Sequence, residues 1–203
     1  GCPWDKVQTH TSIRMNFLEE AYEAVDAIDL DDPELMCEEL GDVLMQVAFH
    51  TCMEQETGRF TWEQVCDGVC QKLIERHPNI FGTQPGYEGI TDWDALKNKE
   101  KGRRTLADDL ESVPRAMPAL MRAAKLQKRA ARHGAALQGA DAAALADAAE
   151  NLQTAQPASA QAEQAVGELL FAAANLARQA GVDPEQALQK ANEAFCTAAG
   201  PVA

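Results

Sequence analysis

Acidic side chains recur at regular spacing in two apolar stretches near the start of the sequence. Glu20 and Glu23 lie three residues apart in the first stretch, and Glu39 and Asp42 have the same spacing in the second. Residues three apart on a helix lie on adjacent turns of one face. Carboxylates brought together there repel one another unless a cation neutralises them. Because every donor is an oxygen, the cation that they favour is Mg²⁺ or Mn²⁺ rather than zinc.

The second stretch predicts a helix with a narrow polar stripe. Residues Glu39, Asp42, Gln46 and His50 form the stripe, and apolar residues cover most of the remaining circumference. A helix that is apolar on most sides is buried on most sides, so we expect the stripe to face a cavity or a partner helix. The alternative is that these acids are ordinary surface groups, because the chain contains 32 Asp and Glu residues.

Cations at helical spacing follow the acidic stretches. Mg²⁺ held by carboxylates typically binds substrate phosphates and activates a water molecule, and the phosphate charge then needs cationic partners. Lys72 and Arg76 lie four residues apart, as do Trp93 and Lys97. Trp93 could stack on a base or a ribose, although a single Trp is more often a core residue. Lys72 and Arg76 could equally form a solvated helix face.

The elements that position these residues are all predicted to be helices. We expect helices over residues 11–29, 33–57 and 61–76, one beginning near Trp93, one within 112–134 and a pair within 162–199. Asp32 is the expected N-cap before Pro33, and Gly58 is the expected stop of that helix. A loop is expected at 77–92, and the alanine-rich residues 135–165 have helical propensity without a packing pattern. Strand patterns are nearly absent, so the predicted fold class is all-α.

Composition and charge narrow the classes of function. The 203 residues suffice for one core or two small helical units, and the net charge of −14 argues against a nucleic acid polymer as partner. No apolar run is long enough for a membrane span. No signal peptide is recognisable in a sequence that begins at Gly1. The six cysteines include no CxxC pair, and we expect a reduced, cytoplasmic protein.

The sequence also contains an internal repeat. The stretch GDVLMQVAF at Gly41 matches GELLFAAAN at Gly167, and GRFTWEQV at Gly58 matches GVDPEQAL at Gly181. We therefore expect two tandem helical copies, one over residues 1–105 and a degenerate one over 106–203. Where the first copy has Glu39, the second has Ala165, so we expect the second copy to be catalytically inactive.

Five motifs carry a resemblance to a known family. The stretches CPWDKVQTH, EEAYE, EELGD and KLIERHPNIFG, with the W-x-x-x-K pattern, resemble MazG nucleoside triphosphate pyrophosphohydrolases. The resemblance implies an all-α bundle whose four-helix core is completed in a homodimer. It also implies Mg²⁺-dependent hydrolysis of a nucleoside triphosphate to a monophosphate and pyrophosphate. The implied metal and catalytic residues are Glu20, Glu23, Glu39 and Asp42, and the implied substrate-binding residues are Lys72, Arg76, Trp93 and Lys97. Glu19 is a weaker candidate for orienting water.

Two other functions stay open at this point. The chain could be a nucleotide-binding regulatory or scaffold module with little turnover, in which the second copy offers an interaction surface. It could also be an enzyme that is narrow for one noncanonical nucleotide or deoxynucleotide. Base and sugar preference depend on pocket shape, which no motif in this sequence predicts.

Overall fold

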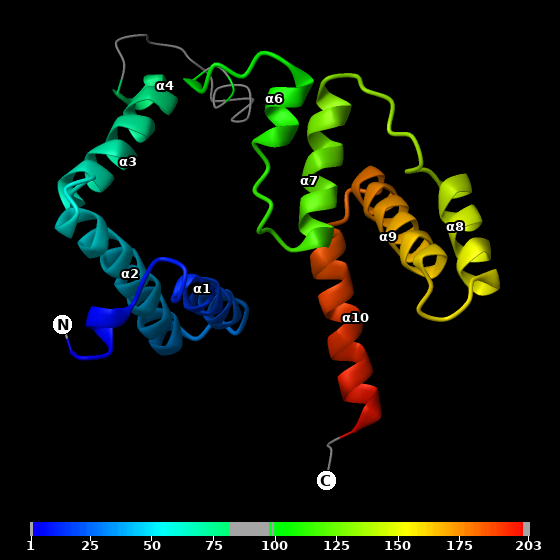
Figure 1. Ribbon diagram of the computed structural model, residues 1–203, viewed down its shortest axis with the longest axis horizontal. Helices are drawn as coiled ribbons and strands as arrows, with labels where there is room; N and C mark the ends of the chain where they lie inside the picture. The colour runs from blue at the N-terminus through cyan, green and yellow to red at the C-terminus, as the bar shows by residue number, and fades with distance from the viewer. Residues whose placement is uncertain (1, 82–97, 99, 201–203) are drawn as a thin grey trace. The chain divides into compact units, whose positions relative to one another are not determined.

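The computed structural model describes residues 2–81, 98 and 100–200, and every regular element among them is helical (Figure 1). The chain divides into two compact units, Gly1–Trp93 and Asp94–Ala203. In the first unit the elements are η1 (Asp5–Val7), α1 (Arg14–Asp29), α2 (Pro33–Glu56), α3 (Trp62–Arg76) and α4 (Pro78–Phe81). In the second they are α6 (Leu106–Glu111), α7 (Ala119–Arg132), α8 (Ala142–Thr154), α9 (Ala160–Gln179) and α10 (Pro184–Ala199). The all-α prediction is confirmed.

Local signals set both ends of α2. The Asp32 carboxylate accepts hydrogen bonds from the backbone N–H groups of Glu34 and Leu35, both at 3.1 Å, and Pro33 opens the helix. Gly58 adopts a φ of 71°, which a residue with a side chain rarely takes, and Arg59 N–H then donates to the Glu54 carbonyl at 3.0 Å. The predicted start and stop of this helix are therefore confirmed.

A capping box opens α3, as the sequence predicts. Thr61 Oγ1 accepts from the backbone N–H of Gln64, and the Gln64 side chain accepts from Thr61 N–H at 2.9 Å. The expected loop that follows begins instead with the short helix α4. Its residues Ile80 and Phe81 both donate their N–H groups to the His77 carbonyl at 3.0 Å, and a proline at the first position suits a helix start.

Small and polar residues lie between α1 and α2, whereas large apolar residues lie outside. Ala24 and Ala27 of α1 are 6% and 0% exposed, which lets the two backbones approach closely. The large apolar residues between 38% and 56% exposed are Leu18, Tyr22, Val25, Ile28, Leu40, Leu44 and Met45. The expectation that α2 is buried on most sides is therefore wrong for the single chain. Its polar stripe faces α1, so its apolar face is turned outward.

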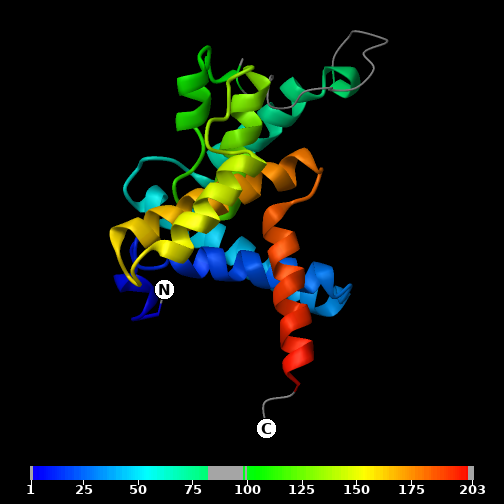
Figure 2. The same cartoon turned by 90° about the vertical axis from the view of Figure 1, so that its right-hand side faces the viewer.

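The second unit has an alanine core. The alanine-rich stretch forms α8, which packs against α9, and α9 also packs against α7. Ala148, Ala165 and Ala172 are at most 2% exposed at these contacts. Alanine has a high helix propensity. Its small side chain also lets helices approach closely where larger residues would hold them apart. Helix α10 projects from this layer, and its Phe195 is 74% exposed (Figure 2).

A buried ion cluster joins α6, which the sequence did not predict, to α7. Asp109 is 1% exposed, and its carboxylate lies 3.1 Å from Arg129, 3.3 Å from Arg132 and 3.2 Å from His133. The Asp109 Oδ1 contact with Arg129 is an ion pair and not a hydrogen bond. Arg129 Nη1 also donates to the Asp109 carbonyl and to the Ser112 hydroxyl. Arg129 and Arg132 thus neutralise an acid of their own unit.

Two further findings bear on sequence expectations. Within the described ranges, none of the helices combines the length and the apolar character that a bilayer crossing requires. All six cysteines are free and exposed. These free thiols agree with the expectation of a reduced protein.

Candidate metal and phosphate site

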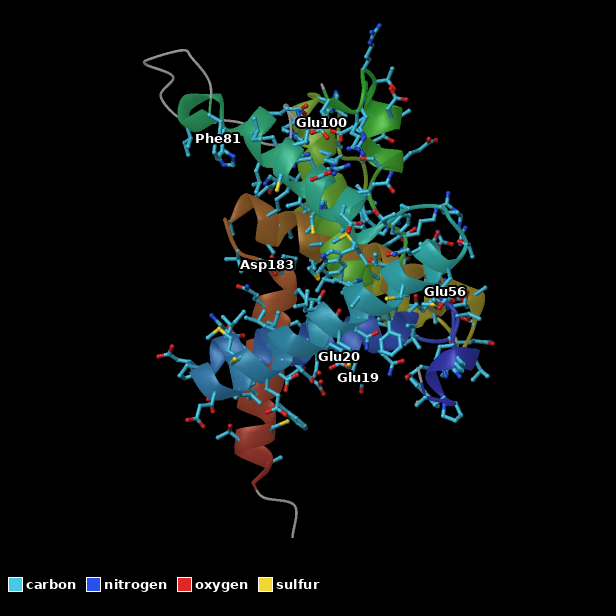
Figure 3. The ribbon with its side chains drawn as sticks, turned by 90° about the vertical axis from the view of Figure 1, so that its left-hand side faces the viewer. Glu19, Glu20, Glu56, Phe81, Glu100 and Asp183 are labelled. Atoms are coloured by element: carbon cyan, nitrogen blue, oxygen red, sulfur yellow. The ribbon has the colours of Figure 1, made fainter. Side chains whose placement is uncertain are left out.

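Three of the predicted acidic residues come together between the first two helices. Glu20 and Glu23 lie on α1 and Glu39 lies on α2, and one carboxylate oxygen of each lies within 4.8 Å of the others. Glu20 lies in the middle of α1, and Glu19 directly precedes it on the same helix (Figure 3). The cluster depends on the close α1–α2 contact at Ala24 and Ala27, because helices held further apart could not bring these side chains together.

The carboxylates of the cluster repel one another, and this repulsion contributes to raised pKa values. Burial raises the pKa of Glu23, and the negative charges of Glu39, Glu20 and Glu19 raise it further. Burial likewise raises the pKa of Glu39, and the negative charges of Glu38, Asp42 and Glu20 raise it further. None of the groups that shift these two pKa values is a cation. A cluster of this kind gains from an external positive charge.

Asp42, the remaining predicted acidic ligand, lies at the edge of the cluster. It is half-buried on α2, one turn beyond Glu39, and its charge contributes to the raised pKa of that residue. It does not belong to the group of three carboxylates whose oxygens meet within 4.8 Å. Glu19 is exposed and acts on the cluster only through its charge on Glu23.

Gln46 continues the same stripe and contacts the cluster directly. Gln46 is 5% exposed, and its side-chain amide nitrogen lies 3.4 Å from Glu20 Oε1. Because a carboxylate can only accept, the contact orients the amide with its N–H toward Glu20. The expectation that the stripe of α2 faces a partner helix is therefore confirmed at this residue.

The stripe ends in a polar cluster that the sequence analysis did not single out. His10 Nε2 lies 2.5 Å from Glu54 Oε1, and Arg59 lies 2.6 Å from the same oxygen. His10 Nδ1 also lies 2.6 Å from His50 Nδ1, and burial together with His10 lowers the pKa of His50. The four-residue spacing from Asp42 through Gln46 and His50 to Glu54 is the sequence signal that could have found this continuation.

An open cavity of about 460 Å³ lies between the N-terminal segment and α2. Its lining includes Asp5 and Lys6 from the segment and Met45, Phe49 and Met53 from the apolar side of α2. Trp4 packs edge-on against Phe49, with ring centroids 6.4 Å apart. The CPWDK motif therefore lies against the central helix of this unit.

Of the predicted substrate-binding residues, the structure describes Lys72 and Arg76, which lie on a different helix from the three carboxylates. Lys72 is exposed on α3 and Arg76 ends that helix, four residues on and on the same face. Helix α3 packs against α2 and diverges from the α1–α2 pair (Figures 1 and 3). Trp93 and Lys97 lie outside the described residues.

The positions of α9 that match the acidic stretch in sequence carry other side chains. Ala165 takes the place of Glu39 and is 2% exposed, and Ala172 takes the place of Gln46 and is 0% exposed. Glu168, at the position of Asp42, is exposed. Of the two stretches that match in sequence, α2 buries the polar Gln46, whereas α9 buries alanines at the matching positions.

The first unit is therefore an all-helical unit with acidic side chains gathered between two packed helices, and comparison with known proteins gives its class. A family model for the MazG nucleotide pyrophosphohydrolase domain matches residues 8–81. A nucleoside triphosphate pyrophosphohydrolase of Escherichia coli K12 is 41% identical over 204 residues, covering 96% of this chain and 78% of the relative.

Two further relatives carry related names. The nucleoside triphosphate pyrophosphohydrolase/pyrophosphatase MazG of Thermotoga maritima is 39% identical, covering 96% of this chain and 76% of its own length. A nucleoside triphosphate pyrophosphohydrolase of Mycobacterium tuberculosis is 38% identical over 136 residues, 65% of this chain and 41% of its own length. The chain belongs to the MazG family.

Proposed function

We propose that the chain hydrolyses nucleoside triphosphates to a monophosphate and pyrophosphate with the help of Mg²⁺ or Mn²⁺. The observation that carries the proposal is the meeting of Glu20, Glu23 and Glu39 within 4.8 Å, where the pKa values of Glu23 and Glu39 are raised and no cation is among the causes. The names of the relatives supply the reaction class.

The donor set fits a divalent cation. All three groups offer carboxylate oxygens, the ligand type that Mg²⁺ and Mn²⁺ prefer, and the repulsion among them is relieved by positive charge. Glu20, Glu23 and Glu39 would hold the cation, and Asp42 would join them from the edge of the cluster. A cation bound there supplies charge neutralisation and Lewis-acid chemistry for the phosphates. A carboxylate of the cluster would orient the attacking water.

Cationic side chains on α3 are proposed to bind the phosphates. Lys72 and Arg76 share one helix face, so they can act on one phosphate chain together. We propose Trp93 and Lys97 as contacts for the nucleoside on the strength of the family resemblance alone. Helix α3 diverges from the α1–α2 pair that carries the carboxylates. Phosphate binding by Lys72 and Arg76 therefore requires α3, of the same chain or of a second copy, to approach the cluster when substrate binds.

A homodimer is proposed because the outer faces of α1 and α2 are apolar. Val25 and Ile28 of α1 are 50% and 53% exposed, and Leu44 of α2 is 56% exposed. Pairing with the same two helices of a second copy would complete a four-helix core. Val25→Asp is expected to shift the molar mass from dimer to monomer in light scattering, whereas Phe195→Asp on α10 is the matched control and should leave it unchanged. A monomeric wild-type chain would contradict this part of the proposal.

The test of the activity is pyrophosphate release from a panel of nucleoside and deoxynucleoside triphosphates, with Mg²⁺ and with EDTA. The wild-type chain is expected to release monophosphate and pyrophosphate together, only with metal. Glu39→Gln should abolish release, because it removes a cluster charge without changing side-chain size. Glu168→Gln, the matching region of α9, should retain it. The panel also reports base and sugar preference.

A different result would favour the second function. If nucleotide binds with Mg²⁺ while no pyrophosphate appears, the first unit is a nucleotide-binding regulatory or scaffold module, and the hydrolase proposal fails. We also propose a reducing, cytoplasmic location, which the six free and exposed thiols support.

A further inference from the structure

Gln46 is a buried polar residue with an unsatisfied atom beside the carboxylate cluster. The residue is 5% exposed, its amide nitrogen points to Glu20 Oε1 at 3.4 Å, and its own Oε1 is buried without a hydrogen-bond partner among the described residues. Leaving a buried amide oxygen unpaired costs roughly 1–3 kcal/mol. A residue that weakens the fold in this way calls for an explanation outside packing.

The second unit has no amide at the position that matches Gln46 in sequence. Counting from the matched Gly41 and Gly167, Gln46 corresponds to Ala172, which is 0% exposed. Glu39 corresponds to Ala165, which is 2% exposed. The buried amide and the cluster carboxylate are thus both replaced by alanine in the copy that lacks the site. Their joint loss ties Gln46 to the chemistry of the cluster.

We propose that Gln46 is a positioning residue of the metal site. Its amide N–H orients Glu20 within the cluster, and its carbonyl oxygen accepts a hydrogen bond from a water ligand that the bound cation brings. Mg²⁺ and Mn²⁺ sites in proteins usually retain such waters, and groups that hydrogen-bond to metal ligands typically change metal affinity about 10–100-fold when they are mutated. This inference rests on the proposed function, because it requires a cation at the cluster.

The decisive measurement is the affinity of the full chain for Mn²⁺ alone, by isothermal titration calorimetry. Gln46→Met keeps the length of the side chain and removes both hydrogen-bonding groups, and Gln46→Ala reproduces the second copy. Both are expected to bind Mn²⁺ roughly 10–100-fold more weakly than the wild type. Gln46→Met should also melt at the same or a higher temperature without metal, because the unpaired oxygen is gone while the volume is kept.

Thr51→Val provides the matched control. Thr51 is 4% exposed on the same helix, and its hydroxyl donates to the Val47 carbonyl at 2.8 Å, away from the carboxylates. Its replacement removes a buried polar group of α2 as well, yet should leave the Mn²⁺ affinity unchanged. A second readout is the Mg²⁺ concentration that half-activates pyrophosphate release, which should rise in Gln46→Met, with much of kcat recovered at excess Mg²⁺.

The outcomes separate the inference from the function on which it rests. Unchanged Mn²⁺ affinity in Gln46→Met and Gln46→Ala, with a wild type that binds and hydrolyses, overturns the role of Gln46 alone. A clear loss of melting temperature in Gln46→Met, with Thr51→Val losing as much affinity, assigns Gln46 to the core and also overturns it. If the wild type binds no Mn²⁺ and releases no pyrophosphate, the proposed function itself fails.

Discussion

The two units of the chain differ in whether their own cations neutralise a group of acidic side chains. In the second unit, Asp109 is 1% exposed and lies within 3.3 Å of Arg129, Arg132 and His133. This carboxylate is already paired with cations of its own unit, and it joins α6 to α7. It is therefore a structural acid, whose partners are supplied by the fold.

The first unit pairs Glu54 with Arg59 and His10 in a similar way, but no such partner within the described residues accompanies the cluster of Glu20, Glu23 and Glu39. Burial raises the pKa of both Glu23 and Glu39, neighbouring carboxylates that include Glu20 raise both pKa values further, and no cation of the described residues is among the causes. The comparison teaches that acid content alone does not predict a ligand site. What distinguishes a site from a structural ion cluster is the missing counter-charge, and each of the following changes tests that distinction.

The largest effect is expected from Asp109→Asn. The substitution leaves Arg129, Arg132 and His133 around a neutral amide, and removing one partner of a buried ion pair typically costs about 3–5 kcal/mol. Urea unfolding should show this loss in the free energy of unfolding of the second unit. Glu111→Gln, at an exposed position of the same helix, should change it by less than about 0.5 kcal/mol. Equal losses of unfolding free energy in the two variants would show that Asp109 has no special structural role.

The counterpart in the first unit is Glu39→Ala, which introduces the residue that α9 has at the matching position. Pyrophosphate release is expected to fall by more than about 100-fold, because a direct ligand should exceed the 10–100-fold effect of residues behind ligands. The melting temperature without metal should not fall, because a mutually repelling charge is removed. If Glu39→Ala instead melts earlier and keeps its activity, the cluster is structural and the comparison of the two units is wrong.

A smaller effect is expected in the pH dependence of stability. The folded-state pKa values of Glu23 and Glu39 are raised, so the folded chain holds more protons than the unfolded chain above the usual carboxylate range. Stability from these groups is fully present below that range and is lost as the pH rises through the raised values. The melting temperature without metal should therefore show a decline from about pH 4.5 upward that is weaker in Glu23→Gln.

Added Mg²⁺ sharpens the same experiment. A cation that binds the ionised cluster stabilises the folded chain more as the pH rises, because it competes with the protons. The melting temperature should then fall less with pH in Mg²⁺ than in EDTA. Identical pH profiles with and without Mg²⁺ would show that the cluster binds no metal in this range.

Much of the first unit could be predicted from local chemistry. The Asp32 cap, the Thr61 capping box and the stop at Gly58 are each written in a few adjacent residues, and each is confirmed. The acidic spacing also predicted the meeting of Glu20, Glu23 and Glu39. These features depend on helix geometry, which fixes neighbours three and four residues apart.

The remaining features depend on contacts between distant segments. The His10–Glu54 contact joins residues 44 positions apart by their numbers, and no local pattern specifies that pairing. The outward apolar face of α2 was also not predictable, because periodicity identifies a face without saying which partner covers it. The alanine-rich stretch gave no packing signal, yet small side chains such as Ala148 allow α8 to approach α9 closely.

The smallest effect tests whether the units differ in local helix formation as well as in charge. Thr61 caps α3 in the first unit and Ser159 caps α9 in the second, each through its side-chain oxygen. Replacing either by alanine should cost about 1 kcal/mol of unfolding free energy. Since both helices are capped in the same way, the two losses measured by urea unfolding should agree within about 0.5 kcal/mol. A loss confined to one unit would mean that its helices depend on caps where the other unit depends on packing, and charge would then not be the main difference between them.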